Sequence, residues 1–141
     1  MRMQIPVLSE AGYPDTLFSD KLAYLKIVRQ GISGSLVKRA LDTMPNQRMV
    51  FCRALGTTSN NLSRFYGRKP LSSQHSEEVL DVLCVYSMAY SLYEDLATAV
   101  ELLNTPLPAL NNEKATDLLD TFLGRKMVKD VLNKMQWGEF T

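Results

Sequence analysis

The chain has 141 residues, which fits one compact domain or two small ones that share a core. Hydrophobic residues make up 45% and charged residues 22% of it, and the formal net charge is +1. This balance is typical of a globular protein and excludes collagen-like and largely disordered chains. No apolar run approaches the roughly 20 residues that span a bilayer, and the first residues lack the apolar region of a signal peptide. We therefore expect a cytoplasmic protein without a membrane segment.

The first thirty residues predict a leader and one helix. Residues 1–18 contain several turn formers and no clear period, which indicates an irregular leader. A helix is expected over residues 19–30, capped by Ser19 and ended by Gly31. Three apolar residues fall on one face of this helix at helical spacing, namely Leu22, Leu25 and Val28.

A second helix is expected next, capped by Ser33 or Ser35 and ended by Pro45. Its buried face consists of Leu36, Val37, Ala40, Leu41 and Met44.

Residues 48–67 have the spacing of a helix-turn-helix. One helix is expected from near Asn46 to just before Gly56, and another over residues 58–66. Cys52 is small where the two helices cross, and Gly56 suits the left-handed turn between them. Four apolar residues of this segment are assigned to the core: Phe51, Leu55, Leu62 and Phe65.

The same part of the chain contains no acidic residue. Between Thr43 and Ser76 there is no Asp or Glu, whereas five basic residues lie there: Arg48, Arg53, Arg64, Arg68 and Lys69. A basic zone in a nearly neutral chain is typical of a surface that binds an anion. Short polar side chains and guanidinium groups suit base edges and phosphates. The candidates for DNA contact are therefore Thr58, Ser59, Asn60, Ser63, Arg64, Arg68 and Lys69. The alternative is a structural helix pair whose polar residues face water.

The longest helix is expected to open at Ser76, with Glu77 and Glu78 in its first turn. Its apolar residues cover more than half of its circumference, which indicates a central core helix or a subunit interface. Shorter helices are expected over residues 96–103 and 114–119.

A final helix is expected over residues 122–135, capped by Thr121 and followed by Gly138. Six apolar residues recur in it at helical spacing: Leu123, Met127, Val128, Val131, Leu132 and Met135. Beyond the helix, the terminal tail carries Trp137 and Phe140. Without further information, these two aromatic residues are interpreted as caps of the core.

Catalytic and metal-ligating side chains are scarce. The chain has one histidine, His75, and two cysteines, Cys52 and Cys84, which lack metal-ligand spacing. Serines near His75 precede a helix, where capping explains them better than nucleophilic catalysis. We therefore expect no catalytic residue, no metal and no cofactor, and we expect that the protein is not an enzyme.

The carboxyl-terminal segment resembles the toxin-binding domain of the Xre/MbcA/ParS family of type II antitoxins. The residues that carry the resemblance are Leu102-Leu103, Pro106-Leu-Pro-Ala-Leu110, Leu118-Leu119, Thr121-x-x-Gly124, Val128, Leu132 and Gly138-x-Phe140. Upstream, Gly31-Ile-Ser-Gly, the helix-turn-helix and Leu71-Ser72 leading to Ser76 resemble the Xre-like DNA-binding half of the same family. The resemblance covers residues 31–141.

The resemblance implies that the partner is a RES-domain toxin that consumes NAD, and that the carboxyl-terminal region covers the toxin's active site. Aromatic anchors and a terminal carboxylate suit an apolar pocket lined with arginines for a dinucleotide. The tail candidates for toxin contact are Trp137, Gly138, Phe140 and Thr141. Gly124 belongs to the same candidate set, and Arg125, Lys126 and Lys129 are candidate rim contacts.

These observations predict an all-α protein with an irregular leader over residues 1–18, an Xre-like helix-turn-helix domain over 19–95 and a toxin-binding domain over 96–141. The predicted function is neutralisation of a toxin, with autorepression of the operon through operator DNA as a second activity. A homodimer through the amino-terminal region is expected. The alternative is a helix-turn-helix repressor whose carboxyl-terminal domain only mediates dimerisation.

Overall fold

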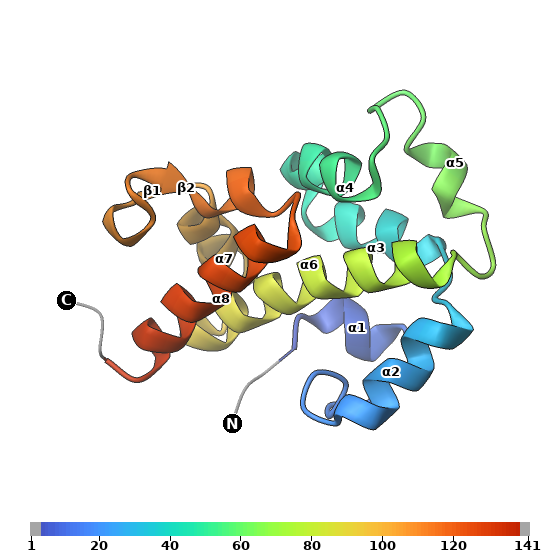
Figure 1. Cartoon of the computed structure of the whole chain (residues 1–141), viewed down its shortest axis with the longest axis horizontal. Coiled ribbons are helices and arrows are strands. Elements are labelled where there is room, and N and C mark those ends of the chain that lie inside the picture. Colours follow the sequence, from blue (N-terminus) through green and yellow to red (C-terminus); the bar gives the residue numbers. More distant parts are fainter. Residues whose placement is uncertain (1–3, 139–141) are drawn as a thin grey trace. The chain divides into compact units, whose positions relative to one another are not determined.

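A computed structural model describes residues 4–138 of the chain (Figure 1). Within these residues the fold is helical, with eight α-helices, three short 3-10 helices and one two-stranded sheet, which confirms the all-α class. The α-helices are α1 (Pro6–Glu10), α2 (Lys21–Gln30), α3 (Ser35–Thr43), α4 (Arg48–Leu55), α5 (Ser63–Tyr66), α6 (Ser73–Tyr93), α7 (Leu96–Leu103) and α8 (Phe122–Gln136). The remaining elements are η1 (Pro45–Gln47), β1 (Pro106–Leu107), η2 (Pro108–Leu110), β2 (Glu113–Lys114) and η3 (Ala115–Leu118).

The chain forms two compact units. Among the described residues, one consists of residues 6–81, and the other of residues 82–138 together with residues 4 and 5. We call them the amino-terminal and the carboxyl-terminal unit. Their boundary falls inside α6, whereas the sequence places a domain boundary after residue 95. That functional boundary stays a prediction.

The expected irregular leader contains a helix, which corrects the sequence interpretation of residues 1–18. Helix α1 buries Val7 and Leu8, and Leu17 is also buried. Helix α1 packs against α3. Apolar side chains that gain a partner helix can order a segment even where Pro and Gly weaken the local helical pattern.

Helix α2 matches its expected range, but its cap differs. Asp20 caps the helix by accepting a hydrogen bond from the Ala23 amide at 3.1 Å, so Ser19 is not the cap. Gly31 ends the helix at φ 86°, as predicted. Of the three apolar residues predicted on one face of α2, Val28 is buried, whereas the other two lie outside the core. Leu22 and Leu25 are exposed.

Helix α3 buries the five residues that the sequence predicts, and it packs against α5. Gly34 precedes α3 and makes this packing possible. A Cβ at Gly34 would lie 1.7 Å from the backbone oxygen of Phe65, a distance that no side chain tolerates. The Gly34 amide also donates a hydrogen bond to the Arg68 carbonyl at 2.8 Å. Close backbone contact therefore fixes α5 against the start of α3.

Helix α6 begins three residues before the predicted start at Ser76. The Ser72 hydroxyl caps it by accepting a hydrogen bond from the His75 amide at 3.0 Å. Ser76 is instead fully buried inside the helix, where its hydroxyl accepts a hydrogen bond from the Ile32 amide at 2.9 Å. Eight core residues of α6 fall in Val79–Ala89, which confirms its wide apolar face: Val79, Leu80, Val82, Leu83, Val85, Tyr86, Met88 and Ala89.

The carboxyl-terminal unit contains α7, the small sheet and α8. Asp95 caps α7, and hydrogen bonds from the Thr98 side chain and amide hold the pKa of the Asp95 carboxyl below its usual value. Strands β1 and β2 pair antiparallel, with Pro106 opposite Lys114. The sequence patterns indicate no strand here. The connection between the strands turns through Asn111 and Asn112, both at positive φ, and α8 packs on η2 and η3.

The buried Ser76 hydroxyl generates a prediction about stability. Ser76→Ala leaves the Ile32 amide without its acceptor, so we expect it to lower the free energy of unfolding by about 1–3 kcal/mol. Thermal and urea unfolding of the purified chain measure this loss. Ser73→Ala, at an exposed position of the same helix, is the control and should change stability by no more than about 0.5 kcal/mol. Equal stability of the two variants would contradict the role of the buried hydroxyl.

Candidate functional site

Helix α8 begins at the cap that the sequence predicts. The Thr121 hydroxyl accepts a hydrogen bond from the Gly124 amide at 3.0 Å. Gly124 is buried, and a Cβ there would lie 1.8 Å from the backbone oxygen of Leu118. Gly124 therefore lets η3 lie directly on the first turn of α8. This packing gives Gly124 a structural role, and its contact with the toxin stays a prediction.

Arg125 is buried, which corrects its expected place at the rim of a binding surface. Only 2% of the residue is exposed, and its Nη1 donates a hydrogen bond to the Leu119 carbonyl at 3.0 Å. Arg125 lies on the same side of α8 as Val128 and Leu132, which are three and seven residues further along and are both buried. Hydrogen bonding from the guanidinium makes this burial tolerable.

The opposite side of α8 exposes large apolar side chains. Phe122 is 70% and Leu123 is 65% exposed, and Met127 is also exposed. Leu123 and Met127 thus share the helical spacing of Val128 and Leu132 in the sequence but lie outside the buried side of α8. These three residues, together with Trp137, are called the outer α8 surface below.

A signal for this exposure exists in the sequence. The apolar residues of α8 include neighbours such as Phe122 and Leu123, so they cover more arc than one buried face can use.

Two candidate rim lysines border the outer α8 surface. Lys126 is exposed and forms an ion pair with Asp130 at 3.6 Å, one helical turn further along. Lys129 is half-buried. An exposed pair of this kind contributes little to stability, so it leaves the lysine available to a partner.

Helix α8 ends at Gln136 with an exposed aromatic residue after it. Trp137 is 74% exposed and does not cap the core of its unit. Gly138 adopts φ 68°, and its amide donates a hydrogen bond to the Met135 carbonyl at 3.2 Å, which confirms it as the residue that follows the helix end. Phe140 and Thr141, the other tail candidates, lie outside the described residues.

In the amino-terminal unit, α4 and α5 form the segment that the sequence interprets as a helix-turn-helix. Helix α4 ends at Gly56, which is left-handed at φ 66°, as predicted. The second helix is shorter than expected, because only Ser63–Tyr66 is helical. Residues 58–62 form turns in which the Asn61 amide donates to the Thr58 carbonyl at 3.1 Å. Ser and Asn side chains compete with helical backbone hydrogen bonds, which favours turns here.

The seven predicted DNA-contact residues lie in this unit. Six of them are exposed: Thr58, Asn60, Ser63, Arg64, Arg68 and Lys69. Ser59 is half-buried and accepts a hydrogen bond from Nε of Arg48 at 2.8 Å. The Arg68 guanidinium lies over the Phe65 ring, 4.4 Å from its centroid, which holds the charge near the surface of α5.

The described residues offer little for catalysis or metal binding. Residues 4–138 contain no group of three His, Cys, Asp or Glu side chains that could hold a metal ion. Burial raises the pKa of the Cys52 thiol, and Arg48 and Arg53 offset this shift only in part, so the thiol remains protonated near neutral pH. Among the same residues, no helix is long and apolar enough to cross a membrane.

The buried position of Gly124 generates a second prediction. Gly124→Ala forces η3 away from α8, so we expect it to lower the free energy of unfolding by about 3 kcal/mol or more. The loss should appear in thermal unfolding of the free chain, without any toxin present. Lys126→Ala is the control on the exposed side of the same turn and should leave the midpoint almost unchanged. A stable Gly124→Ala chain that fails only in toxin binding would instead support Gly124 as a contact residue.

Two comparisons with known proteins agree with this geometry. The family model of the antitoxin Xre/MbcA/ParS C-terminal toxin-binding domain matches residues 88–138, from the last turns of α6 to the end of α8. A Prs ADP-ribosylating antitoxin from Sphingobium sp. (strain YBL2) is 27% identical over 124 residues, which cover 81% of this chain and 78% of that protein. The outer α8 surface thus lies within the segment that matches a toxin-binding domain, and the two comparisons support an antitoxin of the Xre/MbcA/ParS type.

Proposed function

We propose that this antitoxin neutralises its toxin through the outer α8 surface and the tail that follows it, which together cover the toxin's active site. The observation that carries the proposal is the exposure of Phe122, Leu123 and Trp137 within the matched toxin-binding domain. Full burial of a large apolar side chain contributes about 1.5–3 kcal/mol. Several such residues on one short segment provide the anchors that a stable protein interface needs.

The proposed target is a toxin of the RES class, which consumes NAD. Two observations support this class: the resemblance of the carboxyl-terminal motifs, and the name of the Sphingobium relative, which includes ADP-ribosylation. ADP-ribosylation takes its ADP-ribose group from NAD, so both observations lead to a toxin with a dinucleotide pocket. Lys126, Lys129, Gly138, Phe140 and Thr141 are the further residues that we assign to the complex.

We also propose that the amino-terminal unit binds operator DNA and represses its own operon. Six of the seven candidate residues are exposed, and the segment from Thr43 to Ser76 contains five basic and no acidic residues. This is the charge pattern of a surface that tracks phosphates. The match to a toxin-binding domain favours this two-part function over a repressor whose second domain only dimerises. We propose that toxin neutralisation and operator binding both take place in the cytoplasm.

A homodimer through α2 completes the proposal. Leu22 is 81% exposed, and Leu25 lies beside it on the same helix. Asp20 caps the start of α2, whereas Lys26 and Arg29 lie toward its end. Two copies of α2 in antiparallel orientation would bury the leucines and pair opposite charges, which is the arrangement that a two-fold interface requires.

The toxin-binding proposal predicts the effect of removing the apolar anchors. Phe122→Ser combined with Leu123→Ser should weaken binding of the toxin encoded beside the antitoxin by roughly 100-fold or more. Calorimetric titration measures the dissociation constant, and growth rescue in a bacterium that expresses the toxin measures neutralisation. The free chain should unfold at an unchanged temperature, because both side chains are exposed.

Two further variants sharpen this test. Leu22→Ser removes a similarly exposed leucine from α2; it should leave toxin binding intact and shift the chain toward monomer in light scattering. A chain that ends at Gln136 separates the tail from the helix surface and should no longer rescue growth. Loss of binding in Leu22→Ser, with none in the α8 variant, would contradict the assignment of the surface.

The DNA-binding proposal predicts a salt-dependent loss. Arg64→Ala combined with Arg68→Ala should weaken binding to the DNA upstream of the operon and lower the slope of log affinity against log salt by about 2, because two phosphate contacts are removed. Fluorescence anisotropy at several salt concentrations measures both quantities. Toxin neutralisation should be unaffected. Equal loss of both activities would contradict two separable surfaces.

A further inference from the structure

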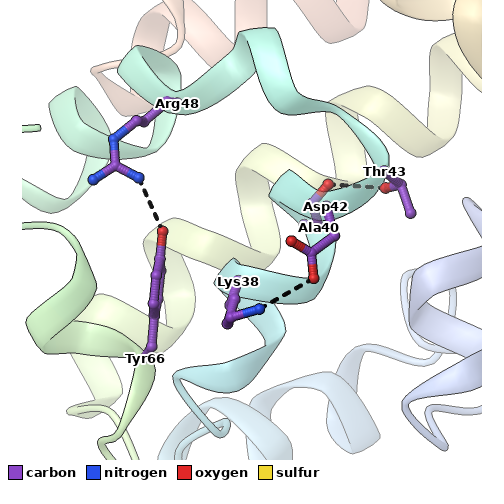
Figure 2. A network of polar contacts seen from close by, with 6 residues as sticks. All are labelled: Lys38, Ala40, Asp42, Thr43, Arg48 and Tyr66. Carbon is purple, nitrogen blue, oxygen red and sulfur yellow. Dashed lines mark hydrogen bonds and ion pairs between the residues drawn. The ribbon is translucent and has the colours of Figure 1, made fainter.

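Arg48 joins the start of α4 to both ends of the turn-and-helix segment that follows Gly56. Its Nε donates a hydrogen bond to the Ser59 hydroxyl at 2.8 Å. Its Nη1 donates to the Tyr66 hydroxyl at 3.2 Å, and Figure 2 shows this second hydrogen bond. Its Nη2 donates to the backbone carbonyl of Ser59. One guanidinium therefore binds residues at the beginning and at the end of the segment from Ser59 to Tyr66.

In the first part of the segment that Arg48 holds, residues 58–61, no side chain is buried, so core packing does little to order the backbone there. Residues 58–61 are polar, and Leu62 is the first side chain after Gly56 that is fully buried. Ser and Asn in such a stretch readily form alternative local hydrogen bonds, so an unsupported backbone would sample several turns. The three hydrogen bonds select one of them. The Ser59 carbonyl that Arg48 engages is also the one that would accept from Ser63 in a helix starting at Ser59.

The surroundings of Arg48 differ from those of the other basic residues between Thr43 and Ser76, a segment without acidic residues that we call the acid-free zone. Arg48 is half-buried, and its donors point at Ser59 and Tyr66, whereas Arg64 is exposed on α5. The guanidinium group is planar, and its N–H donors point in fixed directions, so it can donate to several acceptors at once. The ammonium group of lysine is a compact charge and cannot reproduce this geometry.

We infer that Arg48 is a positioning residue for DNA binding: its guanidinium fixes Thr58, Ser59 and Asn60 in their binding conformation before DNA arrives, and it does not itself contact a phosphate. This inference rests on the proposed DNA-binding function. It follows from general physics that a loop already ordered in the free protein loses less conformational entropy on binding.

Salt dependence distinguishes a positioning residue from a phosphate contact. Arg48→Lys keeps the positive charge but loses the planar guanidinium, and Arg48→Met keeps only the apolar stem. Both should weaken binding to the upstream DNA about tenfold or more while leaving the slope of log affinity against log salt at its unaltered value. Tyr66→Phe removes one of the three hydrogen bonds and should cause a loss of about threefold.

The matched control is Arg64, where the proposal assigns a phosphate contact. Arg64→Lys should retain most of the affinity, and Arg64→Met should lower the slope by about 1. If Arg48→Lys binds like the unaltered chain and Arg48→Met lowers the slope by about 1, then Arg48 is a phosphate contact and the inference is overturned.

Amide hydrogen exchange of the free chain tests, without DNA, whether the hydrogen bonds from Arg48 order the turn; we call these bonds the Arg48 clamp. In Arg48→Lys, amides of residues 57–62 should exchange at least tenfold faster, while amides of the buried part of α6 remain as protected as before. Unchanged exchange over residues 57–62 would overturn the inference even if the variant bound DNA less well. Absence of DNA binding by the unaltered chain at low salt would overturn both the proposed function and the positioning role, and faster exchange would then assign the Arg48 clamp to folding alone.

Discussion

Each unit depends on close approach of a backbone carbonyl to a helix, at a distance that no side chain allows. In the amino-terminal unit, the oxygen of Phe65 would lie 1.7 Å from a Cβ at Gly34, so α5 rests directly on the start of α3. In the carboxyl-terminal unit, the oxygen of Leu118 would lie 1.8 Å from a Cβ at Gly124, so η3 rests on the first turn of α8. Both contacts place the element that carries the proposed binding residues. Only glycine permits such an approach, because any Cβ would push the two backbones apart.

Helix α8 reverses the usual distribution of residues, because a charged side chain is buried on one side and large apolar side chains are exposed on the other. Arg125 is buried with its guanidinium hydrogen-bonded, whereas Phe122 and Leu123 are in contact with solvent. A charged group can be buried when its donors find acceptors, and the Leu119 carbonyl supplies one. Large apolar side chains that remain outside the core do not stabilise the free chain, but they favour association with a partner. Within the segment that matches a toxin-binding domain, α8 therefore has one buried side and one side that exposes large apolar residues.

The acid-free zone shows that charge alone does not assign a role to an arginine. Arg48, Arg64 and Arg68 lie within one short stretch, yet their surroundings differ. Arg48 donates to Ser59 and Tyr66, and the Arg68 guanidinium lies over the Phe65 ring. A guanidinium whose donors are engaged within the fold shapes the backbone around it, whereas an exposed one remains available for an anion. Both contribute to a basic zone, and only the neighbours decide which contribution is made.

The sequence by itself determined the helical class, the ends of several helices and the identity of the toxin-binding segment. Gly31, Gly56 and Thr121 act locally, through positive φ or a capping hydroxyl, so their effect does not depend on distant residues. Tertiary structure decided which faces were covered. A helical period groups Leu22 with Leu25 and Leu123 with Met127, but it does not say whether another element packs on them, and none buries them here. The burial of Arg125, the placement of Ser76 inside α6 and the hold of Arg48 on Ser59 likewise depend on residues that only folding brings near.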